Sequence, residues 1–125
     1  MSKATQKLKR NVLRLAAATL IPAAAFAAAP EEPKVIFIEL GSVNCVPCRM
    51  MQPVMKQVEE KYRGQVKVVF HDVWTPQGQP YGSQYKIVGI PTQVFLDKDG
   101  KEYARHVGFF GFASLEKVLK QGGVK

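Results

Sequence analysis

Cysteine and histidine are both scarce in this chain of 125 residues, with two of each. Cys45 and Cys48 lie together in the segment NCVPC, and His71 and His106 lie far from each other. A structural zinc site usually needs four Cys or His ligands, and no second Cys-x-x-Cys or His-x-x-His pair completes one. A structural disulfide is also a poor explanation, because closing so short a loop gains little stability. The pair therefore favours redox chemistry, with weak binding of copper(I) or zinc as an alternative.

A basic run of the kind that binds phosphate is absent from the body of the chain, although the formal net charge is +8. Residues 1–14 hold five of the 18 Lys and Arg residues and no acidic residue. The other 111 residues contain 13 basic and 10 acidic residues, the balance of an ordinary solvated surface. We therefore expect no nucleic-acid partner.

Long hydrophobic runs are absent as well. The uncharged stretch from Leu15 to Ala29 falls short of the roughly 20 residues that a membrane-spanning helix needs. It follows a basic start and ends in small residues, the pattern of a secretory signal peptide, although an uncleaved anchor or an N-terminal helix would share it. Ala25-Phe26-Ala27 has the small-x-small pattern of a cleavage site. We predict a signal peptide over 1–27, cleavage near 27–29, and a periplasmic or otherwise exported protein.

The remaining sequence predicts one α/β domain over residues 34–125, preceded by a polar tether at 28–33. Apolar runs and alternation predict strands at 34–40, 66–73, 92–97 and 101–108. Helical spacing of apolar residues predicts helices at 49–62 and 113–123, with a short helix near 80–86. Pro53 lies inside the first helix, where it predicts a kink. This order of elements indicates a mixed sheet with helices on both faces.

The cysteine pair follows a predicted strand and begins a predicted helix. Unpaired backbone N–H groups and the helix dipole should lower the pKa of Cys45 there, which makes it the nucleophile. Cys48 would then attack the mixed disulfide and release the product. Val46 and Pro47 fix the turn between them, and the missing N–H of Pro47 costs nothing in a first helical turn.

Three ordered segments resemble the thioredoxin family over about residues 34–122. They are CVPCRMMQPVM at the active site, YKIVGIPT before a strand, and VFLDKDGKEYARHVGF in the last hairpin. The resemblance implies a thioredoxin-like fold, a monomer, and thiol–disulfide exchange with no bound cofactor beyond a redox-active Cys45–Cys48 disulfide. It also implies that Pro91 is cis and faces the cysteines, and that the backbone of Ile90 binds an extended substrate strand.

The sequence departs from the family pattern at four positions near this site. Asn44 replaces the usual Trp, Val46 the Gly of reducing members, Glu39 the buried Asp, and Phe70 the Lys that often neighbours that Asp. A desolvated Glu39 would have a raised pKa and could accept the proton of Cys48, whereas an exposed or ion-paired Glu is the alternative. The family's first strand and helix are also missing, as in its compact exported members.

These features predict an exported protein-disulfide oxidoreductase that reduces disulfides of other exported proteins. In this family a His between the two cysteines tends to accompany more oxidising members. The dipeptide here contains no His, which favours a reductant. A reductant in an exported compartment would need electrons from a membrane electron carrier. Two alternatives remain open: a disulfide donor, and a metal-binding or adaptor module with the same fold.

Overall fold

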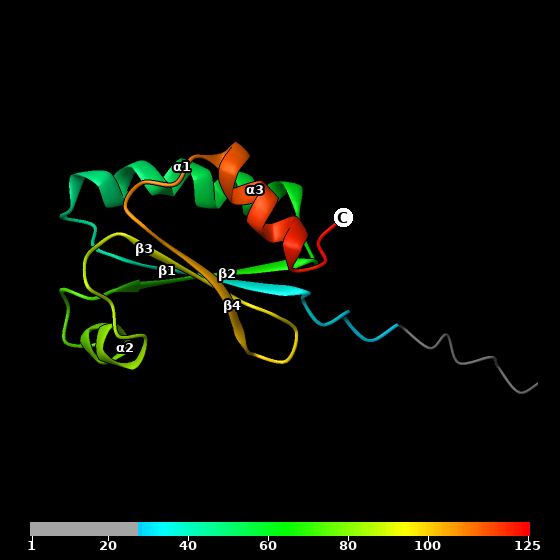
Figure 1. The fold of residues 1–125 in the computed structure, drawn as a ribbon, viewed down its shortest axis with the longest axis horizontal. Helices are drawn as coiled ribbons and strands as arrows, with labels where there is room; N and C mark the ends of the chain where they lie inside the picture. Colours follow the sequence, from blue (N-terminus) through cyan, green and yellow to red (C-terminus); the bar gives the residue numbers. More distant parts are fainter. Residues whose placement is uncertain (1–27) are drawn as a thin grey trace, which may run out of the picture.

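The computed structural model describes residues 28–125 (Figure 1). The elements are β1 (Val35–Gly41), α1 (Val46–Lys61), β2 (Val66–Asp72), α2 (Gln79–Gln84), β3 (Thr92–Leu96), β4 (Glu102–Val107) and α3 (Phe112–Gln121). Every predicted strand and helix is present. The largest difference is that α1 begins at Val46 and not at residue 49. The predicted signal peptide at 1–27 lies outside the described residues.

The four described strands form one mixed sheet in the order β2-β1-β3-β4. β1 is parallel to β2 and antiparallel to β3, and β3 is antiparallel to β4. The helix α1 provides the crossover that a parallel β1–β2 pair requires. Figure 1 shows α1 and α3 on one face of the sheet and α2 on the other. The predicted mixed sheet with helices on both faces is therefore confirmed.

The central strand β1 is almost entirely buried because helices cover both of its faces. Val35 and Phe37 pack in the cluster beneath α1 and α3, whereas Ile38 and Leu40 belong to the cluster on the α2 side. Side chains alternate along a strand, so Glu39 lies on the same face as Phe37. The first helix therefore covers an acidic residue in the middle of the sheet.

The helix α1 packs through an apolar stripe and extends through its internal proline. The residues buried along it are Cys48, Met51, Val54, Met55 and Val58. Pro53 is exposed, and α1 remains one continuous element across it. No helix among residues 28–125 is long and apolar enough to cross a membrane.

Candidate active site

Cys45 and Cys48 form a disulfide at the start of α1. Cys45 is the N-cap residue, and its Sγ accepts a hydrogen bond of 3.4 Å from the backbone N–H of Cys48. Pro47 lies in the first turn, as predicted, and that turn contains no acidic residue. The exposed fraction is 7% for Cys45 and 1% for Cys48, so the first cysteine is the more accessible. The helix N-terminus thus favours a thiolate on Cys45 in the reduced protein.

Limited alkylation of the reduced protein should therefore modify Cys45 before Cys48. The reagent requires a thiolate, and Cys45 has both the helix N-terminus and the greater exposure. Peptide mass spectrometry after treatment with substoichiometric iodoacetamide at pH 7 measures the order. Faster modification of Cys48 would reverse the two roles.

The turn before Cys45 is held by Asp72, whose role the sequence patterns did not reveal. Its carboxylate accepts hydrogen bonds from the backbone N–H groups of Val43 (3.2 Å) and Trp74 (3.0 Å). Burial opposes ionisation of Asp72, yet these backbone hydrogen bonds hold its pKa below the ordinary value. Its role depends on strand register, because Asp72 ends β2 and pairs with Gly41 at the end of β1. Asp72 thus fixes the loop that presents the cysteines.

Glu39 is fully buried, with an exposed fraction of 0%. Its Oε1 accepts a 3.3 Å hydrogen bond from Nε2 of Gln93, and its Oε2 has no partner within residues 28–125. Burial raises the pKa of Glu39 to about 8, and the Gln93 hydrogen bond only partly opposes the rise. The expectation of a desolvated carboxyl is confirmed, and the alternative of an exposed or ion-paired Glu is wrong.

The backbone of β1 places this carboxyl close to the redox pair. Gly41 lies two residues beyond Glu39 on the same face, and a Cβ at Gly41 would lie only 3.1 Å from Sγ of Cys48. A side chain at Gly41 would therefore push Cys48 away from the sheet. On reduction the buried thiol of Cys48 would therefore form against Gly41, on the same face of β1 as Glu39.

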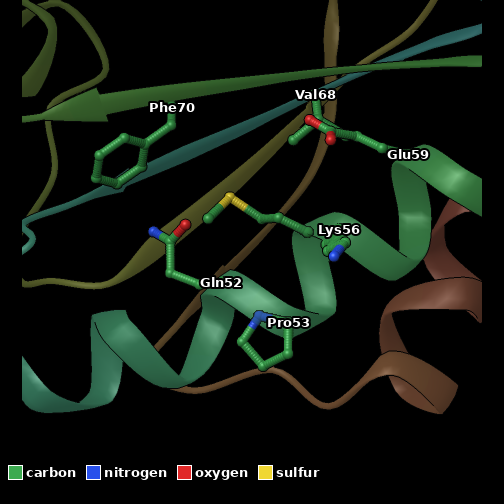
Figure 2. Close-up of a pocket in the computed structure, with 7 residues that line it drawn as sticks. Gln52, Pro53, Lys56, Glu59, Val68 and Phe70 are labelled. Carbon is green, nitrogen blue, oxygen red and sulfur yellow. The ribbon is translucent and has the colours of Figure 1, made fainter.

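Phe70 of β2 pairs with Glu39 and leaves that side of the carboxyl without a charged partner. Phe70 and Val68 also form one wall of a pocket of about 490 Å³ between β2 and α1 (Figure 2). The other residues that line it come from α1: Gln52, Pro53, Met55, Lys56 and Glu59. The pocket therefore lies beside the redox site, and neither cysteine lines it.

The Ile90–Pro91 peptide bond is cis, as the resemblance implies. Thr92 pairs with Leu40 across the β1–β3 ladder, so the same register places Pro91 beside Gly41. Gly41 in turn approaches Cys48, which brings the cis-proline to the cysteine end of the sheet. The carbonyl of Pro91 accepts a 2.7 Å hydrogen bond from the N–H of Gly108, where φ is +95°. Substrate binding by Ile90 stays a prediction.

The two histidines do not converge on the cysteines. His71 pairs with Leu40, and it stacks on Tyr81 of α2 with ring centroids 3.5 Å apart. His106 pairs with Gln93 and so lies on the opposite face of the sheet, with Glu39. Within the part of the chain that the structure describes, no group of three or more His, Cys, Asp or Glu residues could hold a metal ion. A metal site built from both histidines and the cysteine pair is therefore excluded.

A Cys-x-x-Cys disulfide at a helix N-terminus, a buried carboxyl beneath it and a cis-proline beside it define a thioredoxin-like disulfide oxidoreductase. A family model described as "Thioredoxin-like domain" matches residues 22–123. The chain belongs to the thioredoxin family, and its redox-active cysteine pair makes it a disulfide oxidoreductase.

Individual relatives agree with this assignment. Thioredoxin H5 of Arabidopsis thaliana is 32% identical over 96 residues, covering 77% of this chain and 78% of that protein. Thioredoxin 1 of Synechococcus elongatus is 34% identical, covering 67% of this chain and 76% of that protein. Among solved structures, chloroplastic thioredoxin z aligns with a TM-score of 0.64 and 27% identity, covering 72% of this chain and 79% of that one. The four-stranded arrangement is thus a thioredoxin-like fold.

Proposed function

We propose that this protein reduces disulfides of exported proteins through the Cys45–Cys48 dithiol. The observation that most supports the proposal is the asymmetry of the pair: Cys45 is the N-cap residue and the more exposed of the two, whereas Cys48 is fully buried against Gly41, on the sheet face that also holds Glu39. The substrate would bind against Val46, Pro47, Ile90 and Pro91. Val46 is 60% exposed, so an apolar side chain borders the reactive sulfur.

The first step is attack by the Cys45 thiolate on one sulfur of the substrate disulfide. A bond forms between Cys45 Sγ and that sulfur, the substrate S–S bond breaks, and the second substrate sulfur leaves as a thiolate. A backbone strand of substrate beside cis-Pro91 would align the disulfide with Cys45, since Ile90 is partly exposed and offers its peptide groups.

The second step needs a proton acceptor for Cys48. Glu39 as carboxylate takes the thiol proton, and the Cys48 thiolate attacks Cys45 Sγ. The Cys45–Cys48 disulfide forms, and the substrate leaves as its second thiolate. A pKa of about 8 suits this task, because a base is most effective when its pKa lies near the working pH.

The oxidised protein must then regain two electrons. We propose that a membrane electron carrier with a dithiol supplies them by the same exchange in reverse. Glu39 is protonated in the oxidised protein at neutral pH, since its pKa is about 8, so it can return the proton to Cys48.

Reduction of insulin by dithiothreitol, followed as turbidity, tests the exchange activity. The parent protein should accelerate it, and Cys45→Ser and Cys48→Ser should not. A disulfide donor would instead oxidise reduced, unfolded ribonuclease faster than it reduces insulin. A metal-binding or adaptor module would bind copper(I) or a partner with no turnover in either assay.

We also propose that residues 1–27 direct export and are removed after Ala27. A bacterial host that expresses the full chain should accumulate a periplasmic form beginning at Ala28. Intact-protein mass spectrometry of the periplasmic fraction measures this. A soluble product that retains Met1 and stays with the cytoplasmic fraction would contradict both the cleavage and the localisation.

A further inference from the structure

A row of four side-chain positions crosses the sheet under α1. The register aligns Phe70 of β2, Glu39 of β1, Gln93 of β3 and His106 of β4. The last three are joined by hydrogen bonds: Gln93 Nε2 to Glu39 Oε1 at 3.3 Å, and His106 Nδ1 to Gln93 Oε1 at 2.9 Å. The buried carboxyl is thus connected to a half-buried histidine on the edge strand.

The direction of these hydrogen bonds follows from the chemistry of the amide. An amide oxygen only accepts and an amide nitrogen only donates. Gln93 therefore donates to Glu39 only if its oxygen faces His106, and Nδ1 of His106 must then hold a hydrogen. With the amide turned over, its oxygen would face the Glu39 carboxylate, and two acceptors would oppose each other.

The imidazole of His106 is itself held in place. It stacks on Phe110, with ring centroids 4.0 Å apart and an interplanar angle of 9°. The backbone N–H of Phe110 donates to Sδ of Met51 at 3.3 Å, which joins this segment to α1. Gln93 is fully buried, so no solvent competes for its amide. His106 can therefore determine which end of that amide faces Glu39.

We propose that His106 is a positioning residue for the exchange reaction, which orients the Gln93 amide so that its N–H faces Glu39 and favours the carboxylate. This inference rests on the proposed role of Glu39 as proton acceptor. An amide does not pass a proton readily, so His106 acts by orienting the Gln93 side chain. Without it the Gln93 amide is no longer held with its N–H toward Glu39 and can turn its oxygen to the protonated carboxyl, so Glu39 ionises at higher pH and Cys48 loses its proton more slowly at neutral pH.

Other titratable groups near this row belong to neighbouring elements. Cys48 of α1 lies against Gly41, two residues beyond Glu39 on the same face, and the uncharged Phe70 borders Glu39 from β2. Lys56 and Glu59 of α1 line the pocket on the far side, over Val68 and Phe70. β4 is the edge strand of the described sheet, so no further strand faces His106. The pH response of Glu39 should therefore depend mainly on Gln93, His106 and the state of Cys48.

The experiment is the pH profile of the resolution step, measured by stopped-flow as loss of a preformed mixed disulfide on Cys45. His106→Leu should slow resolution at pH 7 by about three- to tenfold, the effect of one ordinary hydrogen bond. It should raise the midpoint of the pH profile, by up to about one unit, and restore the parent rate at high pH. His106→Gln keeps an N–H donor and should recover most of the rate.

Matched controls separate positioning from folding. His71→Leu removes the other half-buried histidine, which also stacks on an aromatic ring but lies on the opposite face, and it should leave the midpoint unchanged. In a Glu39→Gln background, His106→Leu should add no further loss. If Glu39→Gln itself has no effect, the proposed role of Glu39 fails. If Glu39→Gln slows resolution but His106→Leu leaves the midpoint in place, only the positioning role is wrong.

A measurement on the unaltered protein keeps the inference testable if the variant does not fold. Nitrogen-15 NMR of the imidazoles at a pH where His106 is neutral reports which ring nitrogen holds the hydrogen. The proposed orientation requires the Nδ1–H form of His106. A dominant Nε2–H form with bare Nδ1 would overturn the proposal, because Gln93 would then present its oxygen to Glu39.

Discussion

Cys48→Ser should abolish turnover and leave the protein covalently joined to its substrate. Cys45 keeps its N-cap position at the start of α1 and still attacks. A serine hydroxyl does not displace the substrate sulfur at neutral pH, so the mixed disulfide accumulates. Insulin reduction should fall to the uncatalysed rate. Non-reducing gel electrophoresis and intact mass should show an adduct that dithiothreitol releases.

The matched control is Cys45→Ser, which should also lose turnover but form no adduct. The two variants thus distinguish the nucleophile from the resolving thiol with the same assay. An adduct on Cys45→Ser, or turnover by Cys48→Ser at the parent rate, would contradict the assigned roles.

Glu39→Gln should slow resolution of the mixed disulfide at pH 7 by about 10²–10⁴-fold, the usual cost of losing the main base. Attack by Cys45 should be retained, because its thiolate is favoured by the helix N-terminus and not by the carboxyl of Glu39 in the sheet. Stopped-flow separates the two steps. Glu59→Gln is the matched control, because it removes an exposed carboxyl of α1 that lines the nearby pocket. Release of product at the parent rate would mean that the proton of Cys48 goes elsewhere.

The same substitution has a second consequence, for stability. The unfolded chain releases the Glu39 proton near the ordinary glutamate pKa of 4.5, whereas the folded protein keeps it to about 8. The folded state therefore binds more protons in this window, and the free energy of unfolding falls as pH rises from about 4.5 to about 8. The Glu39→Gln variant has no carboxyl to ionise at this position and does not lose stability in this way. The difference between its Tm and that of the parent should therefore grow in favour of the variant as pH rises over the same range. Calorimetry at pH 5 and pH 8 measures the difference, and an unchanged difference would contradict the burial of an ionisable Glu39.

Much of the fold could be predicted because its signals are local. The apolar run at residues 34–40 and the helical stripe after Cys48 each specify one element with little help from the rest of the chain. The cis bond at Pro91 and the burial of Glu39 came from the resemblance to a family, since no local rule distinguishes them from a turn proline and a surface carboxyl. The helix begins three residues before its predicted start because Pro47 fits the first turn of a helix. The spacing of apolar residues does not detect this feature.

The Glu39–Gln93–His106 row and the Asp72 contacts could not be predicted, because they depend on strand register. The residues of the row are 54 and 13 positions apart in sequence. They meet only because the β1–β3 and β3–β4 ladders pair them on one face, and a slip of one residue would turn them to opposite faces. Asp72 likewise contacts Val43 only through the parallel β1–β2 pairing.

The reduction potential of the Cys45–Cys48 couple tests most directly whether this protein reduces disulfides. Equilibration in glutathione buffers of defined ratio, followed by acid quenching and thiol-specific labelling, gives the oxidised fraction at each potential. A reductant should have a potential near that of thioredoxin, about −270 mV, because the proposed reaction must pass electrons to substrate disulfides. A value near −120 mV, typical of strongly oxidising disulfide donors, would contradict the account and make oxidation of exported thiols the reaction.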